Sequence, residues 1–219
     1  MHTWKPFSIL GRGLAGRALG SAWEAGTGGV RLLPSAARPE GFVLLAVPDG
    51  AIPALALEFP GRCAHLSGSL HLEGVPSVHP LTSFDGTPSR WEGTPLALTG
   101  AVPEDLVAAF EALGFLPFRL PAELKPLYHA CAALASGHAA SLCLGAAGLL
   151  AQAGVTLPGR GLAPLAEAAL RHAEVHGTAG LTGPFRRRDT ETIARDALAL
   201  PGPWRDIFQR LGSRIQEQS

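Results

Sequence analysis

The segment GRGLAG, residues 11–16, constrains the fold of this chain more than any other feature. Its spacing Gly-x-Gly-x-x-Gly is weak by itself, because 27 of the 219 residues are glycine. Its context is informative: Phe7 to Leu10 is a short apolar run typical of a buried strand, and Leu14 to Glu24 has apolar residues at helical spacing. A strand, a glycine turn and a helix in this order predict a nucleotide-binding unit.

Each glycine has a separate physical role in such a turn. Gly11 permits the tight turn, Gly13 lets a pyrophosphate approach the backbone, and Gly16 lets the helix pack closely on the strand. The free N–H groups at the start of the helix favour phosphate. Arg12 either adds charge there or is a solvated side chain. The predicted phosphate cradle comprises Gly11, Arg12, Gly13, Leu14, Ala15 and Gly16.

The remaining pattern predicts an α/β Rossmann-type N-terminal domain, residues 1–122, followed by an all-α domain, residues 123–219. Further apolar runs and helical patterns alternate through the first part, and long Ala/Leu-rich helical patterns occupy the second. The expected strands are Val30–Leu33, Phe42–Val47, Cys63–Leu66, Ser77–Val78, Pro95–Leu98 and Leu116–Leu120. The expected helices are Ile52–Phe59, Glu104–Leu113, Leu127–Ala153, Ala163–His176, Asp189–Leu200 and Trp204–Ile215.

Composition excludes several function classes. The formal net charge is zero, so nothing in the whole-chain charge favours nucleic acid or an anionic membrane. Three dispersed cysteines without CxxC spacing argue against a disulfide framework and fit a reducing, cytoplasmic compartment. The apolar stretch Ala130 to Val155 contains Ser, His and Gln residues, which favour a packed helix over a membrane span. The first ten residues lack the apolar core of a signal peptide.

The loop after the second strand indicates which dinucleotide binds. It contains Ser35 and Arg38 and has no acidic residue before Glu40. A hydroxyl and a cation suit a 2′-phosphate, so we expect NADP, with NAD less favoured; a turn role for both residues is the alternative. The segment between Leu33 and Phe42 is too short for a crossover helix, so it crosses in extended form or the strand order differs.

Six segments occur along the chain in a characteristic order: ILGRGLAGRALG, LLAVPDGAI, HLSGSL, SVHPLTSF, LYHACAALAS and LTGPFRRRD. With them the chain resembles, over nearly its whole length, the bacterial Rossmann-like proteins that carry a DUF2520 C-terminal domain. The resemblance implies an NADP-dependent oxidoreductase related to pyrroline-5-carboxylate reductase and 6-phosphogluconate dehydrogenase. It also implies a helical domain that forms a homodimer and a substrate held between the two domains, with ketopantoate as one candidate.

The chain departs from the family pattern in two motifs. Gly137 and His138 stand where the family usually has Asn, and Arg187-Arg188-Asp189 stands where it has Arg-Gly-Asp. An amide missing from a substrate site leaves a second hypothesis open. Under this hypothesis, the chain is a catalytically altered dinucleotide-binding protein that acts as a sensor or partner-binding module.

Reduction of a small carboxylate-bearing oxo or imino compound needs a proton donor and a group that holds the substrate's charge. Lys125, Tyr128 and His129 lie at the domain junction, and His79 follows a strand at the edge where α/β sheets bind ligands. We predict Lys125, His129 and His79 as catalytic residues. A solvated lysine and a backbone-capped histidine are the structural alternatives for Lys125 and His129.

Other site residues are predicted from strand ends and from the LTGP segment. The additional cofactor-binding candidates are Val47, Pro48, Asp49, Ser67 and Gly68, although Asp49 is best explained as a helix N-cap. The substrate-binding candidates are Thr82, Ser83, Tyr128, Thr182 and Gly183. No metal site is predicted, because His172 and His176 lack a third ligand.

Overall fold

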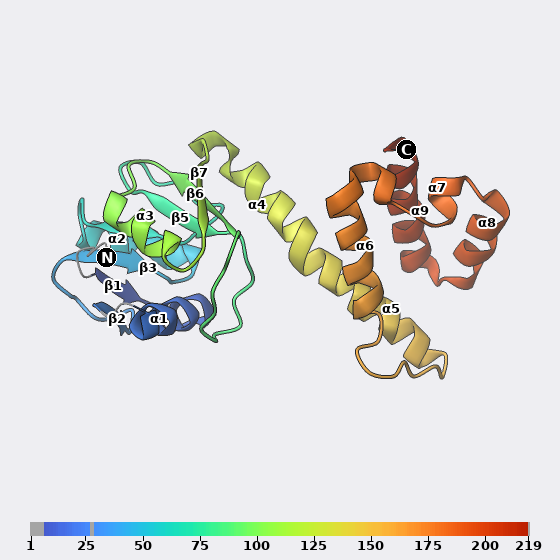
Figure 1. Ribbon diagram of the computed structural model, residues 1–219, viewed down its shortest axis with the longest axis horizontal. Helices are drawn as coiled ribbons and strands as arrows, with labels where there is room; N and C mark the ends of the chain where they lie inside the picture. The colour runs from blue at the N-terminus through green and yellow to red at the C-terminus, as the bar shows by residue number, and fades with distance from the viewer. Residues whose placement is uncertain (1–6, 27–28, 219) are drawn as a thin grey trace. The chain divides into compact units, whose positions relative to one another are not determined.

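The computed structural model describes residues 7–26 and 29–218, and the chain divides into two compact units, Met1–His138 and Ala139–Ser219. The first unit consists of a sheet with helices, and the second consists of helices (Figure 1). The predicted fold class, an α/β Rossmann-type part followed by an all-α part, is therefore confirmed.

The described residues of the first unit form one seven-stranded sheet. Its strands are β1 (Phe7–Leu10), β2 (Val30–Leu33), β3 (Phe42–Leu45), β4 (Cys63–His65), β5 (Ser77–Pro80), β6 (Pro95–Thr99) and β7 (Leu116–Arg119). The order is β2-β1-β3-β4-β5-β6-β7, and neighbouring strands are parallel except β5 and β6. The order reverses between β1 and β3, where Leu10 pairs with Leu45, and α/β sheets bind ligands at such a point.

Helices cover both faces of this sheet. The apolar side chains of α1 (Leu14–Gly26) and α3 (Glu104–Glu111) belong to the core cluster on one face, and those of α2 (Ile52–Glu58) belong to the cluster on the other. The buried indole Nε1 of Trp23 donates a hydrogen bond of 2.7 Å to the carbonyl oxygen of Ala109, which ties α1 to α3. The two core clusters, one on each face of the sheet, therefore hold in place the strands whose ends form the site.

The connection between β2 and β3 contains no helix. Its residues 34–41 cross β1, because β2 and β3 pair with opposite sides of that strand. The loop crosses without a helix and includes a turn at residues 34–37, and the strand order is that of the β2-β1-β3 unit.

The helix that the sequence predicts over Leu127–Ala153 contains a π-helical turn. The structure has α4 (Lys125–Ala133), a π-helical turn (Leu134–His138) and α5 (Ala139–Gln152), and the two units divide at this turn. By length and composition alone, the helical segment Ala122–Gln152 is apolar enough to cross a membrane, and its apolar window is not buried in the structure; one such helix is weak evidence.

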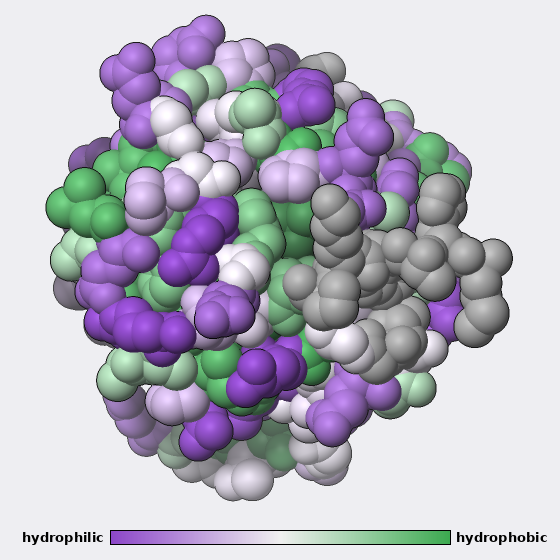
Figure 2. Space-filling view, turned by 90° about the vertical axis from the view of Figure 1, so that its left-hand side faces the viewer, coloured by the Kyte–Doolittle hydropathy of each residue, from purple (hydrophilic) through white to green (hydrophobic). Residues whose placement is uncertain are grey.

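The second unit has little buried apolar surface of its own. After α5 it contains α6 (Ala163–His176), the short α7 (Pro184–Arg187), α8 (Thr190–Ala199) and α9 (Gly202–Glu217). Phe185 and Ala197 are its only buried apolar side chains among the described residues, and no side chain of α5 or α6 is buried. On the face of the molecule that Figure 2 shows, outside the grey residues, hydrophilic and hydrophobic residues are interspersed.

Candidate functional site

The glycine turn between β1 and α1 has the geometry that its spacing predicts. Gly11 has φ +117°, and a Cβ there would collide with the carbonyl oxygen of Ala46. A Cβ at Gly16 would collide with the carbonyl oxygen of Gly11. In contrast, a Cβ at Gly13 would meet nothing within 4 Å. Packing therefore requires two of the glycines, whereas the third borders open space.

The open space over Gly13 lies at the exposed start of α1. Arg12, Gly13 and Leu14 are exposed, and Ala15 is half-buried. The N–H groups of a helix's first turn lack partners within the helix, so they favour an anion. Arg17 supports the turn by donating from Nη1 to the carbonyl oxygen of Arg12 at 2.9 Å, a contact that the sequence did not reveal.

The loops that follow β3 and β4 are joined by a carboxylate. Val47 and Pro48 precede Asp49, whose Oδ2 accepts hydrogen bonds from the hydroxyls of Ser67 (2.8 Å) and Ser69 (2.9 Å). The expected N-cap role of Asp49 is wrong, because its side chain makes no cap hydrogen bond and instead accepts from these two hydroxyls. The network fixes the carboxyl edge of the sheet beside the glycine turn.

Lys125 is almost wholly buried, with 1% of its surface exposed. Its Nζ donates to the carbonyl oxygen of Ser67 at 2.9 Å and to Oγ of Ser77 at 2.7 Å. Burial lowers the Lys125 pKa to about 8, although the nearby Asp49 carboxylate opposes this shift. These bonds hold the start of α4 against β4 and β5, so the ammonium is committed to protein acceptors.

His79 lies next to this cluster, on β5, and contacts α4. Its Nδ1 is 2.9 Å from the hydroxyl oxygen of Tyr128, and the two tautomers of the ring decide which group donates. Burial, and then the charges of Lys125 and His129, lower the His79 pKa to about 4, so the ring is neutral at pH 7. Burial raises the Tyr128 pKa to about 12, so its hydroxyl keeps its proton.

Two neighbours define the surroundings of the His79 ring. A Cβ at Gly68 would lie 2.8 Å from Nε2 of His79, so Gly68 makes room for the imidazole. The ring centroid of the exposed His129 is 6.3 Å from that of His79. The structure thus brings together the predicted residues His79, Tyr128, His129 and Gly68.

His65 is a buried polar residue that sequence reasoning missed. Its Nδ1 accepts from the backbone N–H of Ser67 at 3.2 Å, and its buried Nε2 has no hydrogen-bond partner among the described residues. Burial, more than the neighbouring charges, lowers the His65 pKa to about 4. Its neutral ring therefore carries the proton on Nε2. The sequence signal that could have revealed this residue is a histidine at the end of an apolar strand.

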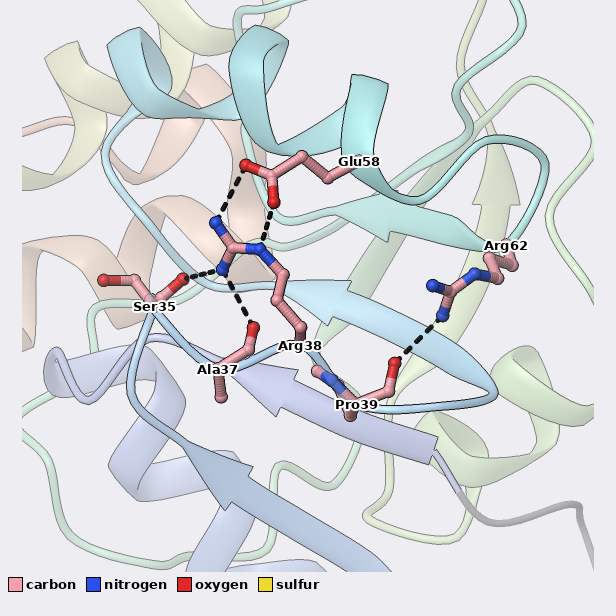
Figure 3. Close-up of polar contacts among 6 residues, drawn as sticks. All are labelled: Ser35, Ala37, Arg38, Pro39, Glu58 and Arg62. Carbon is pink, nitrogen blue, oxygen red and sulfur yellow. Dashed lines mark hydrogen bonds and ion pairs between the residues drawn. The ribbon is translucent and has the colours of Figure 1, made fainter.

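The two predicted 2′-phosphate residues lie in the β2–β3 loop (Figure 3). Arg38 donates from Nη1 to the carbonyl oxygens of Ser35 and Ala37, at 3.1 and 3.0 Å. Its Nη2 and Nε contact the two carboxylate oxygens of Glu58, on α2. Arg38 is therefore paired with an acid far along the chain, which the local sequence did not show.

The remaining predicted substrate residues belong to two separate segments, one directly after β5 and one in the second unit. Thr82 and Ser83 belong to the loop after β5. A Cβ at Gly86, in the same loop, would approach Leu14 and Arg17 of α1 to 3.2 and 3.1 Å, so this loop reaches the glycine turn. Thr182 and Gly183 precede α7 in the second unit. Their roles stay a prediction.

A cavity of about 350 Å³ lies at the opposite edge of the sheet. Phe42, Cys63 and Pro76, at the amino ends of β3, β4 and β5, line it together with His71. The polar cluster of Lys125 and His79 does not line this cavity. No group of three or more His, Cys, Asp or Glu residues suited to a metal ion occurs in the described part of the chain.

Several solved structures are similar over nearly the whole chain. One is protein TM1727 from Thermotoga maritima, with 18% identity, 97% of each chain covered and a TM-score of 0.74. Another is BF3122 from Bacteroides fragilis, described provisionally as an NADP oxidoreductase, with 17% identity, 97% and 98% coverage and a TM-score of 0.80. A third is a reductive aminase from Aspergillus terreus with NADPH and ethyl levulinate, with 14% identity, 98% and 93% coverage and a TM-score of 0.66.

These identities are low, so the solved structures support the fold alone. Among curated protein sequences, none matches the chain. The profile of DUF2520, a domain of unknown function, matches residues 95–215, which is more than half of the sequence. The chain therefore belongs to the DUF2520 family.

Proposed function

We propose that this chain is an NADP(H)-dependent reductase of a small carboxylate-bearing oxo or imino compound. The observation that carries the proposal is the open space over Gly13, because Gly11 and Gly16 on either side are packed against backbone atoms. That space lies at the start of α1, beside the point where the strand order reverses. Room for a pyrophosphate at such a place is what dinucleotide binding requires.

The similar structures support the same activity class. The description of BF3122 names an NADP oxidoreductase, and the Aspergillus reductive aminase is in complex with NADPH. Ser35 and Arg38, in the loop after β2, support NADP over NAD for this chain, because a cation there suits a 2′-phosphate. Ketopantoate is a candidate substrate within the proposed class.

The described residues supply the proton chemistry of such a reduction. When bound, the nicotinamide would supply the hydride. His79 and Tyr128 share one hydrogen bond, and both are neutral at pH 7, so together they hold a proton that a reduced oxygen or nitrogen takes up. The exposed His129 beside His79 connects this pair to solvent.

Lys125 acts differently in this proposal from the sequence-based expectation of direct catalysis. Its Nζ is committed to the Ser67 carbonyl and the Ser77 hydroxyl, so it positions the loops around His79 and adds positive potential. Thr82 and Ser83, in the loop that reaches the glycine turn, are the proposed contacts for the substrate's polar groups.

Replacing Gly13 with alanine is expected to weaken NADPH binding by about tenfold or more, because the added methyl group occupies the space proposed for the pyrophosphate. The midpoint of thermal unfolding should change little, since nothing lies within 4 Å of that methyl position. Fluorescence titration of the full chain with NADPH and NADH measures the effect.

Gly26→Ala is the matched control, because a Cβ there also meets open space but lies at the far end of α1. It should bind NADPH like the wild type. The proposed function fails if the folded wild type binds neither dinucleotide at millimolar concentration. If Gly13→Ala binds NADPH as tightly as Gly26→Ala does, the pyrophosphate does not bind over Gly13.

The second candidate function is dinucleotide binding without turnover, as in a sensor or partner-binding module. Gly137, which replaces the asparagine usual in the family, lies within the π-helical turn and has no side chain to contact a substrate. NADPH oxidation with any small oxo acid, abolished by His129→Ala or Lys125→Ala in folded protein, would exclude this candidate.

We propose that the helical unit forms a homodimer. Leu144, Leu165, Leu170 and Val175, on the successive helices α5 and α6, have 64–75% of their surface exposed, which is a large exposure for so many apolar side chains. Analytical ultracentrifugation should therefore show a dimer for the wild type. Leu144→Glu should shift it to monomer, because a charge would be buried at the interface.

Leu57→Glu is the matched control for the dimer, since Leu57 on α2 of the α/β unit is 83% exposed. It should leave the sedimentation of the wild type unchanged. A wild type that sediments as a monomer at micromolar concentration would contradict the homodimer.

We also propose that the protein acts in the cytoplasm. Cys63, Cys131 and Cys143 are all free, as expected in a reducing compartment.

A further inference from the structure

The β2–β3 loop is held in place by two arginines instead of a crossover helix. Arg62 donates from Nη1 to the carbonyl oxygens of Pro39 (3.1 Å) and Gly41 (2.8 Å). Arg38 donates to the carbonyl oxygens of Ser35 and Ala37 and pairs with Glu58, as Figure 3 shows. The loop thereby has a defined conformation although it contains no regular element.

This loop starts beside the glycine turn. The backbone N–H of Gly11 donates to the carbonyl oxygen of Leu33, the last residue of β2, at 3.0 Å. The next residues form a turn in which the N–H of Ala37 donates to the carbonyl oxygen of Pro34 at 3.0 Å. In dinucleotide-binding folds, the residues just after this strand read the ribose 2′ position.

The Arg38 guanidinium is already engaged by an acid. Its Nε and Nη2 face both oxygens of Glu58, which is the bidentate arrangement that a phosphate would otherwise take. The Glu58 carboxylate neutralises the cation and occupies the two donors that a 2′-phosphate would take. Both side chains are substantially exposed, at 48% and 39%, so water screens the pair and a phosphate can displace the acid.

We propose that Glu58 is a specificity-determining residue, which competes with the 2′-phosphate for Arg38 and so lowers the preference for NADP(H) over NAD(H). This inference rests on the proposed function, because it assumes that a dinucleotide binds at the glycine turn. Glu58 is on α2, 20 residues after Arg38, and makes no other contribution to the proposed chemistry.

Glu58→Gln tests the inference because it keeps the size of the side chain and removes its charge. The Kd for NADPH should fall by about tenfold, and the Kd for NADH should stay within about twofold of the wild type. The gain should shrink at high salt, since it is electrostatic between exposed groups. Full-length protein is titrated with each dinucleotide by fluorescence, and the thermal midpoint checks that the variant is folded.

Three further variants distinguish the Arg38–Glu58 pair from a general charge effect. Glu40→Gln also removes one negative charge, from the loop that contains Arg38, and should leave the ratio of the two Kd values unchanged. Arg38→Ala should abolish the NADPH preference, and adding Glu58→Gln to it should have no further effect, because the partner of Glu58 is gone.

The outcomes distinguish this inference from the proposed function. If no variant binds either dinucleotide, the proposed function fails and the inference falls with it. If both dinucleotides bind but Glu58→Gln leaves the ratio of Kd values unchanged, or Glu40→Gln changes it equally, the inference alone is overturned. An unchanged gain in the Arg38→Ala background also overturns it.

Discussion

Replacing His79 with glutamine is expected to lower the turnover number for reduction by about 10²- to 10⁴-fold while the chain stays folded. Glutamine can still hydrogen-bond to the Tyr128 hydroxyl, but it cannot pass a proton between two ring nitrogens. Because the His79 pKa is lowered to about 4, the native ring is neutral and can both donate and accept at pH 7. Steady-state kinetics with NADPH and the best oxo acid of a substrate panel measure the loss.

His71→Gln is the control for this variant, because His71 is an exposed histidine beside the cavity at the opposite edge of the sheet. Its turnover should equal that of the wild type. Tyr128→Phe should cost less than His79→Gln, since the ring nitrogens remain. If His79→Gln reduces the oxo acid as fast as His71→Gln does, His79 is not part of the proton path.

The first half of the fold was predictable because its signals are local. Phe7–Leu10, the glycine turn and the start of α1 are adjacent in sequence, and each has a distinct periodicity or a steric requirement. The missing helix between β2 and β3 followed from chain length alone. The antiparallel direction of β6 was not predictable, since a strand pattern does not record its direction.

The polar contacts of the site depend on the tertiary fold. Lys125 reaches Ser67 and Ser77 across about 50 residues or more, and Asp49 reaches Ser67 across 18. No periodicity encodes such pairs, so the sequence could place Lys125 near the site without showing that its ammonium is committed to protein acceptors. Asp49 was misinterpreted for the same reason, because a carboxylate before a helix is usually a cap.

Arg38 shows why a local sequence motif is insufficient to predict which dinucleotide is preferred. The local sequence supplied a serine and an arginine after β2, and this pattern favoured a 2′-phosphate. The packing of α2 then brought Glu58 to the guanidinium, which changes the electrostatic potential that a phosphate meets. The proposed cofactor preference therefore depends on two elements, the loop and the end of α2.

Replacing Lys125 with methionine is expected to lower the free energy of unfolding by an amount that increases with pH. At pH 7 the variant loses both hydrogen bonds of Nζ and leaves the Ser67 carbonyl and the Ser77 hydroxyl without that donor. This loss is worth about 1–3 kcal/mol, and it is offset in part because no buried charge remains.

The pH dependence follows from the Lys125 pKa, which burial lowers from 10.5 to about 8 in the folded chain. Between these values the unfolded chain holds a proton on Lys125 that the folded chain has released, so the wild type gains stability as the pH rises. The gain from pH 8 to 10 is at most about 2.7 kcal/mol, and methionine cannot provide it. Urea unfolding of both proteins at pH 7, 8, 9 and 10 measures the difference, and common contributions from Cys63 and Tyr128 cancel. A difference that stays constant with pH would mean that the folded chain solvates this ammonium as well as the unfolded chain does.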